Sequence, residues 1–187
     1  MEQADSVAME RGSCLELVLA HHGKVPLAPP VLIVGRADGM GFGDVAMIGQ
    51  ALMQAGVGPV EGVSFETLTT QLVDPLKLNL YRTTITLGAL AWSFDVLRAL
   101  TSVVRQTAFG GQLLCVEPAN DCLSQGYFQI TPTALQRFAE ANELPVTANT
   151  LFTRPQPEGG VGLFFAARKR AGSTWERRPS PLPYTRG

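Results

Sequence analysis

Several features that would identify a membrane, secreted or redox protein are missing from this sequence of 187 residues. No apolar run reaches the roughly 18 residues that a membrane-spanning helix needs, so we expect no membrane span. The first 13 residues are acidic, whereas a secretory signal is basic and then apolar. The three cysteines, Cys14, Cys115 and Cys122, form no CxxC pair, which argues against zinc and redox motifs and favours reduced thiols in a cytoplasmic protein.

Basic residues and histidines are also too few, or wrongly placed, for several kinds of site. The net charge is −1, and residues 1–167 contain nine Lys or Arg against fifteen Asp or Glu, which argues against nucleic-acid binding. The two histidines, His21 and His22, are adjacent and do not share a helix face. We therefore expect surface histidines, no metal site and no histidine-based catalytic triad. The GxxxxGK[ST] pattern of a P-loop is absent.

What is present suits one globular domain. Hydrophobic residues make up 45% of the chain and charged residues 17%, enough for a single core at this length. Prolines cluster at residues 26–30, and residues 168–187 contain six Lys or Arg and one Glu. We expect an N-terminal helix that ends near Gly23 and a proline-rich lead-in at residues 1–30, a domain at residues 31–169, and a basic, flexible tail at residues 170–187.

Apolar runs alternate with helix-period segments along this domain. The predicted strands cover residues 31–34, 60–63, 83–87, 112–116, 146–152 and 161–167; the first is apolar without alternation, and the third is rich in β-branched residues. The predicted helices cover residues 44–55, 94–107 and 131–142; the second has a stripe of Phe94, Leu97, Leu100 and Val104. Strands separated by helices form parallel units, and the Pro- and Gly-rich loop between the last two strands predicts a hairpin. The fold class is therefore α/β, a Rossmann-like three-layer sandwich with a mostly parallel sheet and an antiparallel C-terminal edge.

A glycine-rich segment, Gly35-Arg-Ala-Asp-Gly-Met-Gly-Phe-Gly43, follows the first predicted strand. Ligands of open α/β sheets bind at the carboxyl ends of strands, where glycines allow close backbone approach and offer N–H donors. The segment predicts a ligand loop made by Gly35, Asp38, Gly39, Gly41 and Gly43, with a tight turn that binds nothing as the alternative. Its spacing also fits short-chain dehydrogenases, but no tyrosine here has the lysine four residues on that those enzymes need.

The order of motifs from residue 83 onwards resembles that of a known family. A strand and loop, Thr84-Ile-Thr-Leu-Gly-Ala-Leu-Ala-Trp-Ser-Phe-Asp95, precede a helix and then Phe109-Gly-Gly-Gln-Leu-Leu-Cys-Val-Glu-Pro-Ala-Asn120. With Gly126-Tyr-Phe-Gln-Ile-Thr-Pro132 and Gly162-Leu-Phe-Phe-Ala-Ala-Arg-Lys169, this order is similar to that of class I S-adenosylmethionine-dependent methyltransferases. The resemblance covers roughly residues 31–169.

The resemblance implies a small methyltransferase that binds S-adenosylmethionine and acts on a small molecule or sugar-type substrate. Besides the glycine segment, the implied cofactor site contains Gly88 and, near the ribose, Ser64 and Glu66. Glu117 is a candidate general base, or alternatively a strand-end carboxylate in solvent; Tyr127 lines the substrate mouth or packs within its loop. A homo-oligomer is compatible with this interpretation.

Three positions depart from the family pattern. Ile33 and Ser64 stand where the first two strands usually carry acidic residues, and Ala91-Trp92 replaces a Glu-His pair. Each change removes polar groups that would bind a cofactor. The alternative function is therefore a catalytically inactive methyltransferase-like module for binding or assembly. Methyl transfer depends mainly on alignment of the reacting atoms, so the enzyme hypothesis is retained beside it.

Overall fold

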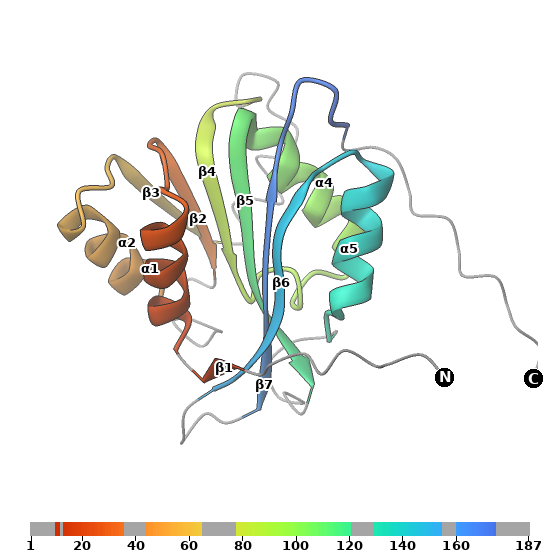
Figure 1. Ribbon diagram of the computed structural model, residues 1–187, viewed down its shortest axis with the longest axis horizontal. Helices are drawn as coiled ribbons and strands as arrows, with labels where there is room; N and C mark the ends of the chain where they lie inside the picture. The colour runs from red at the N-terminus through yellow and green to blue at the C-terminus, as the bar shows by residue number, and fades with distance from the viewer. Residues whose placement is uncertain are drawn as a thin grey trace, which may run out of the picture.

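One mixed sheet with helices on both faces organises the computed structural model, which describes residues 10–11, 13–35, 44–64, 78–120, 129–154 and 160–174 (Figure 1). The strands are β1 (Glu10–Arg11), β2 (Val31–Gly35), β3 (Val60–Ser64), β4 (Tyr81–Leu87), β5 (Thr107–Asn120), β6 (Val146–Thr153) and β7 (Val161–Arg168). The helices are α1 (Cys14–Lys24), α2 (Val45–Gln54), α4 (Val96–Gln106) and α5 (Pro132–Ala141). No helix of these residues is both long and apolar enough to cross a membrane.

The sheet is mostly parallel, as predicted. Its strand order is β1-β6-β7-β5-β4-β2-β3, and β7 alone among the described strands runs antiparallel to its neighbours, β5 and β6. The predicted hairpin of β6 and β7 is confirmed. Because residues 162–167 are buried throughout, β7 suits an interior position, and β6 with β1 forms the outer edge on that side.

The three predicted layers are present. Helices α1 and α2 cover one face of the sheet, and α4 and α5 cover the other (Figure 1). Strand β2 is buried on both faces: Val31 and Ile33 pack in the cluster that contains α1 and α2, and Leu32 and Val34 pack in the cluster that contains α4 and α5. This burial explains why the strand lacks polar alternation.

Two of the predicted helices are capped by the first residue of their predicted range. The Asp44 carboxylate accepts hydrogen bonds from the N–H groups of Ala46 (2.8 Å) and Met47 (3.1 Å) at the start of α2. The Thr131 hydroxyl accepts from the Ala134 N–H at the start of α5, where Pro132 occupies a position that needs no N–H.

The predicted buried stripe of α4 is wrong at its first two residues. Phe94 is 79% exposed and Leu97 is 38% exposed, whereas Leu100 and Val104 are buried. Asp95 caps the helix by accepting a hydrogen bond from the Arg98 N–H, so Phe94 precedes the helix and does not belong to its face. The buried face is completed by other residues, Ala99 and Val103 among them.

Helix α1 also corrects two expectations. It continues through Gly23 to Lys24, and His21 is buried instead of lying on the surface. The His21 Nε2 atom lies 3.3 Å from Gln112 Oε1, and the ring packs against Phe164 at 5.5 Å between centroids. Burial lowers the pKa of His21, which favours a neutral ring. A helix packed on the sheet has an inward face, and His21 occupies it.

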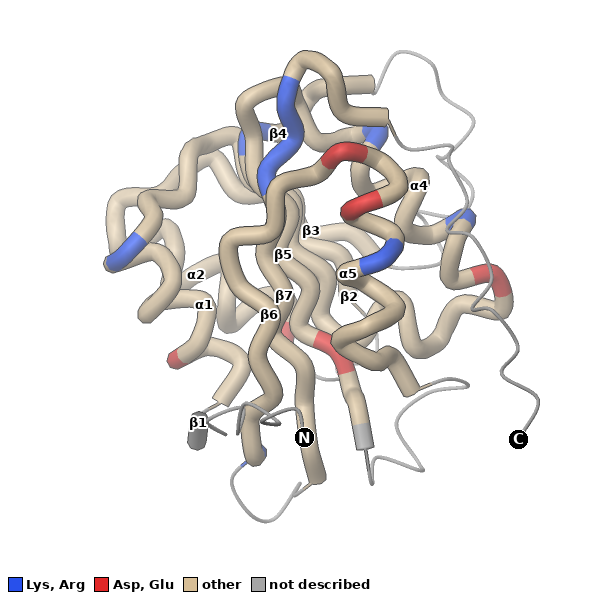
Figure 2. The backbone as a smooth tube through the Cα atoms, turned by 45° about the vertical axis from the view of Figure 1, so that its right-hand side comes forward, with Lys and Arg blue, Asp and Glu red and all other residues tan. Residues whose placement is uncertain are grey.

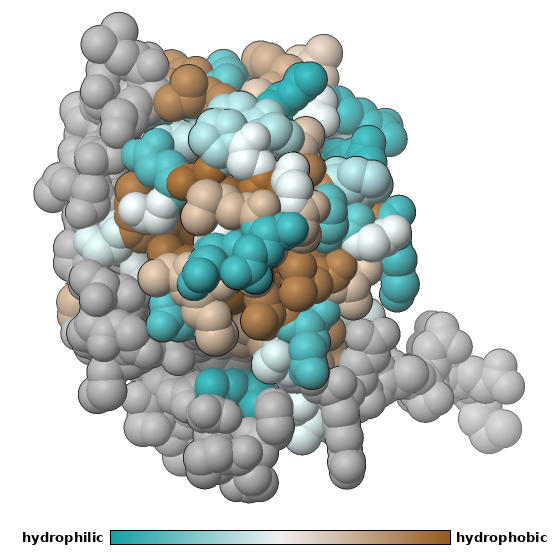
Figure 3. Space-filling model, turned by 90° about the vertical axis from the view of Figure 1, so that its left-hand side faces the viewer, coloured by the Kyte–Doolittle hydropathy of each residue, from teal (hydrophilic) through white to brown (hydrophobic). Residues whose placement is uncertain are grey.

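Charged residues are dispersed over the described elements (Figure 2). The side that bears β3 and α2 shows hydrophobic side chains among hydrophilic ones (Figure 3). Met47 and Met53 of α2 are 49% and 55% exposed. Single exposed hydrophobic residues of this kind are ordinary on a protein surface.

A buried lysine joins the last strand to the end of α4. Lys169 Nζ donates hydrogen bonds to the carbonyls of Val104 (2.8 Å) and Thr107 (2.7 Å) and to Asn79 Oδ1 (2.7 Å), and it lies 4.8 Å from the centre of the Phe109 ring. Burial and the Arg105 charge lower the pKa of Lys169 to about 8. The cation complements the carbonyl end of the helix.

We predict that Lys169→Met lowers the free energy of unfolding by at least about 2 kcal/mol, because buried carbonyls lose their donor. Urea unfolding followed by circular dichroism measures this change. Lys24→Met, the same substitution at an exposed position in the last turn of α1, serves as the control and changes stability little. Equal effects of the two substitutions would contradict the structural role of Lys169.

Candidate functional site

The carboxyl ends of β2, β3, β4 and β5 lie at one edge of the sheet, because these strands are parallel (Figure 1). Gly35 ends β2 and is the register partner of Ser64, which ends β3. Gly88 directly follows β4 on the other side of β2. Open α/β sheets bind ligands at such an edge.

The structure therefore brings together the predicted site residues Gly35, Ser64 and Gly88. The predicted residues that lie outside the described part of the chain are Asp38, Gly39, Gly41, Gly43, Glu66 and Tyr127. Within the described residues, no group of three His, Cys, Asp or Glu side chains could hold a metal ion.

Gly35 has a packing role that the sequence analysis did not predict. A Cβ atom at Gly35 would overlap Val45 Cγ2, and a Cβ atom at Gly62 of β3 would lie 2.7 Å from Val45 Cγ1. The first residue of α2 thus sits against two glycines on adjacent strands. A glycine in each of two neighbouring strands, with a β-branched residue at the start of the helix that connects them, is the sequence signal for this contact.

The segment that connects β4 to α4 forms one wall of this edge. Gly88 has φ +67°, a conformation that favours glycine, and its N–H donates to the Val116 carbonyl of β5 at 2.8 Å. Further along, the Ser93 hydroxyl donates to the Asp95 carbonyl (3.0 Å) and accepts from the Asp95 N–H (3.2 Å). Both ends of the segment are therefore fixed by hydrogen bonds.

Glu117 lies beneath this segment and is completely buried. Its Oε1 accepts a hydrogen bond from Thr86 Oγ1 of β4 (2.6 Å), and its Oε2 accepts one from the Ala91 N–H (3.3 Å). Burial raises the pKa of Glu117 to about 8, although hydrogen bonds from Thr86, Ala91 and the Leu90 N–H act to lower it. Burial also raises the pKa of the Cys115 thiol, and the Glu117 charge adds to that shift.

The burial of Glu117 overturns the interpretation that it ends its strand in solvent. Its carboxyl binds a neighbouring strand and a loop, so it connects three segments. The sequence analysis missed its partner, Thr86. Thr84 and Thr86, at alternating positions of β4, are the available signal, because they place two hydroxyls on the face that receives the glutamate.

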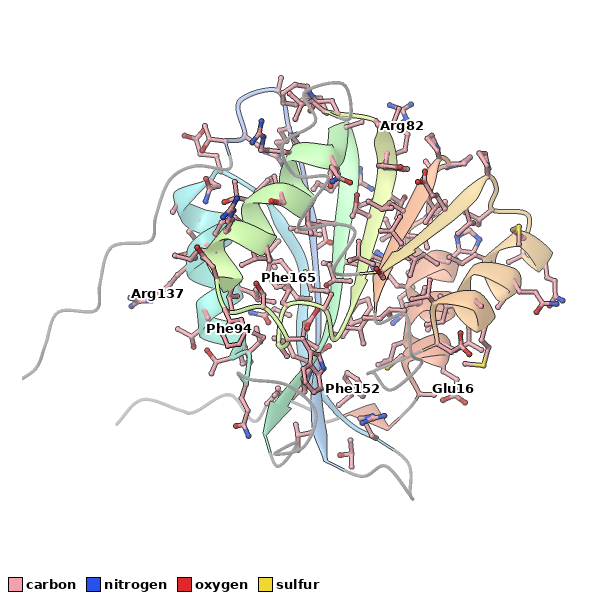
Figure 4. The ribbon with its side chains drawn as sticks, turned by 180° about the vertical axis from the view of Figure 1, so that it is seen from behind. Glu16, Arg82, Phe94, Arg137, Phe152 and Phe165 are labelled. Atoms are coloured by element: carbon pink, nitrogen blue, oxygen red, sulfur yellow. The ribbon has the colours of Figure 1, made fainter. Side chains whose placement is uncertain are left out.

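Hydrophobic residues lie between the end of this segment and the first turn of α4, a region that we call the rim of the site. Phe94 lies just before α4, in the segment that follows β4 (Figure 4), and Leu97 lies in the first turn of the helix. Both are exposed, and Trp92 is half-buried. The rim thus offers apolar contacts beside the backbone groups of the edge.

Solved structures that are similar to this chain include methyltransferases. The chain is similar to Burkholderia thailandensis 1,6-didemethyltoxoflavin-N1-methyltransferase, whose structure contains 1,6-didemethyltoxoflavin and S-adenosylhomocysteine: TM-score 0.59, 14% identity, 83% of this chain and 78% of that chain. It is also similar to a putative methyltransferase from Bacillus halodurans C-125, with TM-score 0.59, 13% identity, and coverage of 85% and 100%. A third similar chain belongs to the complex of the Haloferax volcanii Trm112 methyltransferase activator with a putative methyltransferase, with TM-score 0.59, 12% identity, and coverage of 82% and 88%.

These similarities show that the chain has the class I methyltransferase fold, which confirms the fold that the motif order implied. No protein-family model and no curated protein matches the sequence. At identities of 12% to 14%, the shared property is the fold.

We predict that Gly35→Ala lowers the free energy of unfolding by about 1–3 kcal/mol, because the new methyl group overlaps Val45. Val45→Ala in the same chain should recover part of this loss, which a double-mutant cycle in urea measures. The control is Gly49→Ala in α2. Its Cβ would meet Val60 at an ordinary 3.5 Å, so stability should stay equal or rise by about 0.5–1 kcal/mol. Additive effects at positions 35 and 45 would contradict the contact.

We also predict a pH-dependent contribution of Glu117 to stability. Its pKa of about 8 in the fold exceeds the ordinary 4.5, so between these values the folded state holds a proton that the unfolded state has released. Raising the pH therefore favours unfolding. The free energy of unfolding of wild type, measured relative to that of Glu117→Gln, should fall by up to about 1.4 kcal/mol per pH unit between pH 5 and 7.5. Urea unfolding across this range measures it, and a difference independent of pH would be the contrary result.

Proposed function

We propose that this chain is an S-adenosylmethionine-dependent methyltransferase that acts on a small molecule. The observation that carries the proposal is the edge where Gly35, Ser64 and Gly88 meet, in a fold shared with an enzyme whose structure contains S-adenosylhomocysteine. The glycine-rich residues 35–43 follow β2 directly at this edge. A cytoplasmic location and a homo-oligomeric state are further expectations of this proposal.

The polar groups of the described edge fit a nucleoside ligand. The Ser64 hydroxyl both donates and accepts hydrogen bonds, as the hydroxyls of a ribose require. Gly88 has no side chain where β4 ends, so no Cβ atom would keep a ligand away from the backbone there, whereas Val45 occupies the place that a side chain at Gly35 would take. The Ile33 side chain is buried in the core between β2 and α2 and takes no part in this set.

The residues of this chain would act mainly by positioning. S-adenosylmethionine supplies a methyl group activated by a sulfonium. Ser64 and the glycines would hold the nucleoside part, and the segment after Gly88 would form the wall next to the reacting atoms. Phe94 and Leu97 would contact an apolar part of the substrate at the rim. Alignment of this kind accounts for a large share of the rate of group transfer between two bound molecules.

A catalytically inactive binding module is the second candidate. Ile33 in the core and Ala91 against Glu117 support it, because neither position offers a polar side chain to a cofactor. Val45 also occupies the space beside Gly35 and Gly62. This candidate requires that the edge bind no S-adenosyl compound.

Calorimetric titration with S-adenosylhomocysteine and S-adenosylmethionine tests the proposal. We expect both to bind the wild-type chain. Ser64→Ala should weaken binding by about tenfold, since one hydrogen bond to the ligand is lost. Ser102→Ala is the matched control, because the Ser102 hydroxyl donates to the Arg98 carbonyl within α4.

Absence of heat with either compound at high protein concentration would overturn the enzyme proposal and favour the binding module. Binding that Ser64→Ala and Ser102→Ala weaken equally would contradict the role of Ser64 while leaving cofactor binding intact.

A further inference from the structure

The segment between β4 and α4 is bound to β5 at two successive points. Its first residue, Gly88, donates its N–H to the Val116 carbonyl. Its middle is bound by the next residue of β5, since the Ala91 N–H donates to Glu117 Oε2 and the Leu90 N–H also binds the carboxyl. The last part, from Ser93 onwards, is fixed by its own local hydrogen bonds.

Glu117 is a costly residue for a purely structural position. A carboxyl that is 0% exposed has lost its contacts with water, and an apolar side chain would not bear that cost. The cost is partly offset because the carboxyl accepts hydrogen bonds from two elements: the Thr86 hydroxyl of β4 and the backbone of the segment at Ala91. The carboxyl thus joins the end of β4 to the turn that follows it.

We propose that Glu117 is a positioning residue of the candidate active site: it holds Leu90 and Ala91 from beneath and so sets the wall between Gly88 and Trp92. This inference rests on the proposed methyltransferase function. Glu117 does not need to touch a ligand in this role. It acts through the backbone that the ligand would meet.

Amide hydrogen exchange measured by NMR tests the positioning without any ligand. Glu117→Ala should raise the exchange rates of the Leu90 and Ala91 amides by about tenfold, because their acceptor is removed. Glu117→Gln should keep them near the wild-type rates, because its amide oxygen still accepts from the segment and its NH2 group donates to Thr86 Oγ1. The Gly88 amide bonds to a backbone carbonyl and serves as the internal reference.

Thr86→Val gives an independent and milder perturbation, in case Glu117→Ala fails to fold. It removes the donor to Glu117 Oε1 and should raise the same two exchange rates severalfold. Thr84→Val is the matched control. Thr84 lies on the same strand and the same face, is equally buried, and bonds to Thr107 Oγ1 instead of Glu117.

Binding of S-adenosylhomocysteine supplies the functional readout. Affinity should fall about tenfold in Glu117→Ala, be restored in Glu117→Gln, and stay unchanged in Thr84→Val. The fluorescence of Trp92, observed alone in a Trp175→Phe background, should change on binding in wild type and Glu117→Gln and change less in Glu117→Ala.

The outcomes separate this inference from the proposed function. A wild-type chain that binds no S-adenosylhomocysteine overturns the function and, with it, the site that Glu117 would position. Normal binding by wild type together with unchanged Leu90 and Ala91 exchange in Glu117→Ala overturns the inference alone. Faster exchange with unchanged affinity and fluorescence does so as well, because Glu117 would then be only structural.

Discussion

Parallel pairing of β2 with β3 on one side and β4 on the other is the constraint on which the candidate site depends. Side chains of β2 are closely packed on both faces, and Val45 of α2 fits against Gly35 and Gly62, so a shift in register would disrupt this packing. That register places Gly35 opposite Ser64 and brings the turn at Gly88 to the same edge. The Val45 side chain, seated against Gly35 and Gly62, then determines how closely α2 approaches the two strands.

Two buried polar side chains connect further elements to the central strands by hydrogen bonds. Glu117 lies toward the carboxyl end of β5 and connects β4 with the segment that follows it. Lys169 follows β7 at the opposite end of the sheet and binds the carbonyl end of α4. Lys169 therefore holds the carbonyl end of α4, and Glu117 holds the segment that leads into the N-terminus of this helix. Each residue has a desolvation cost that is offset only when all of its partners are in place.

Local sequence features predicted most of the elements and their order. Apolar runs identified the strands of the parallel sheet, and Asp44 and Thr131 marked the beginnings of two helices, because these signals depend on neighbouring residues. The prediction that Phe94 belongs to the buried stripe of α4 was wrong because Asp95 caps the helix, so that the helix begins after Phe94. The prediction that His21 lies on the surface was wrong for another reason. Its burial depends on Gln112 and Phe164, which are distant in sequence.

By itself, the sequence determined the α/β class, the mostly parallel sheet and the hairpin of β6 and β7, because hydrophobic periodicity and turn signals are local properties. The tertiary structure alone decided that Glu117 points inward to Thr86 and Ala91, and that Gly35 admits Val45. The partners of Glu117 are more than 25 residues away from it in the sequence. Whether a carboxyl meets water or a buried donor depends on strand order and register, which pair residues that no local pattern connects.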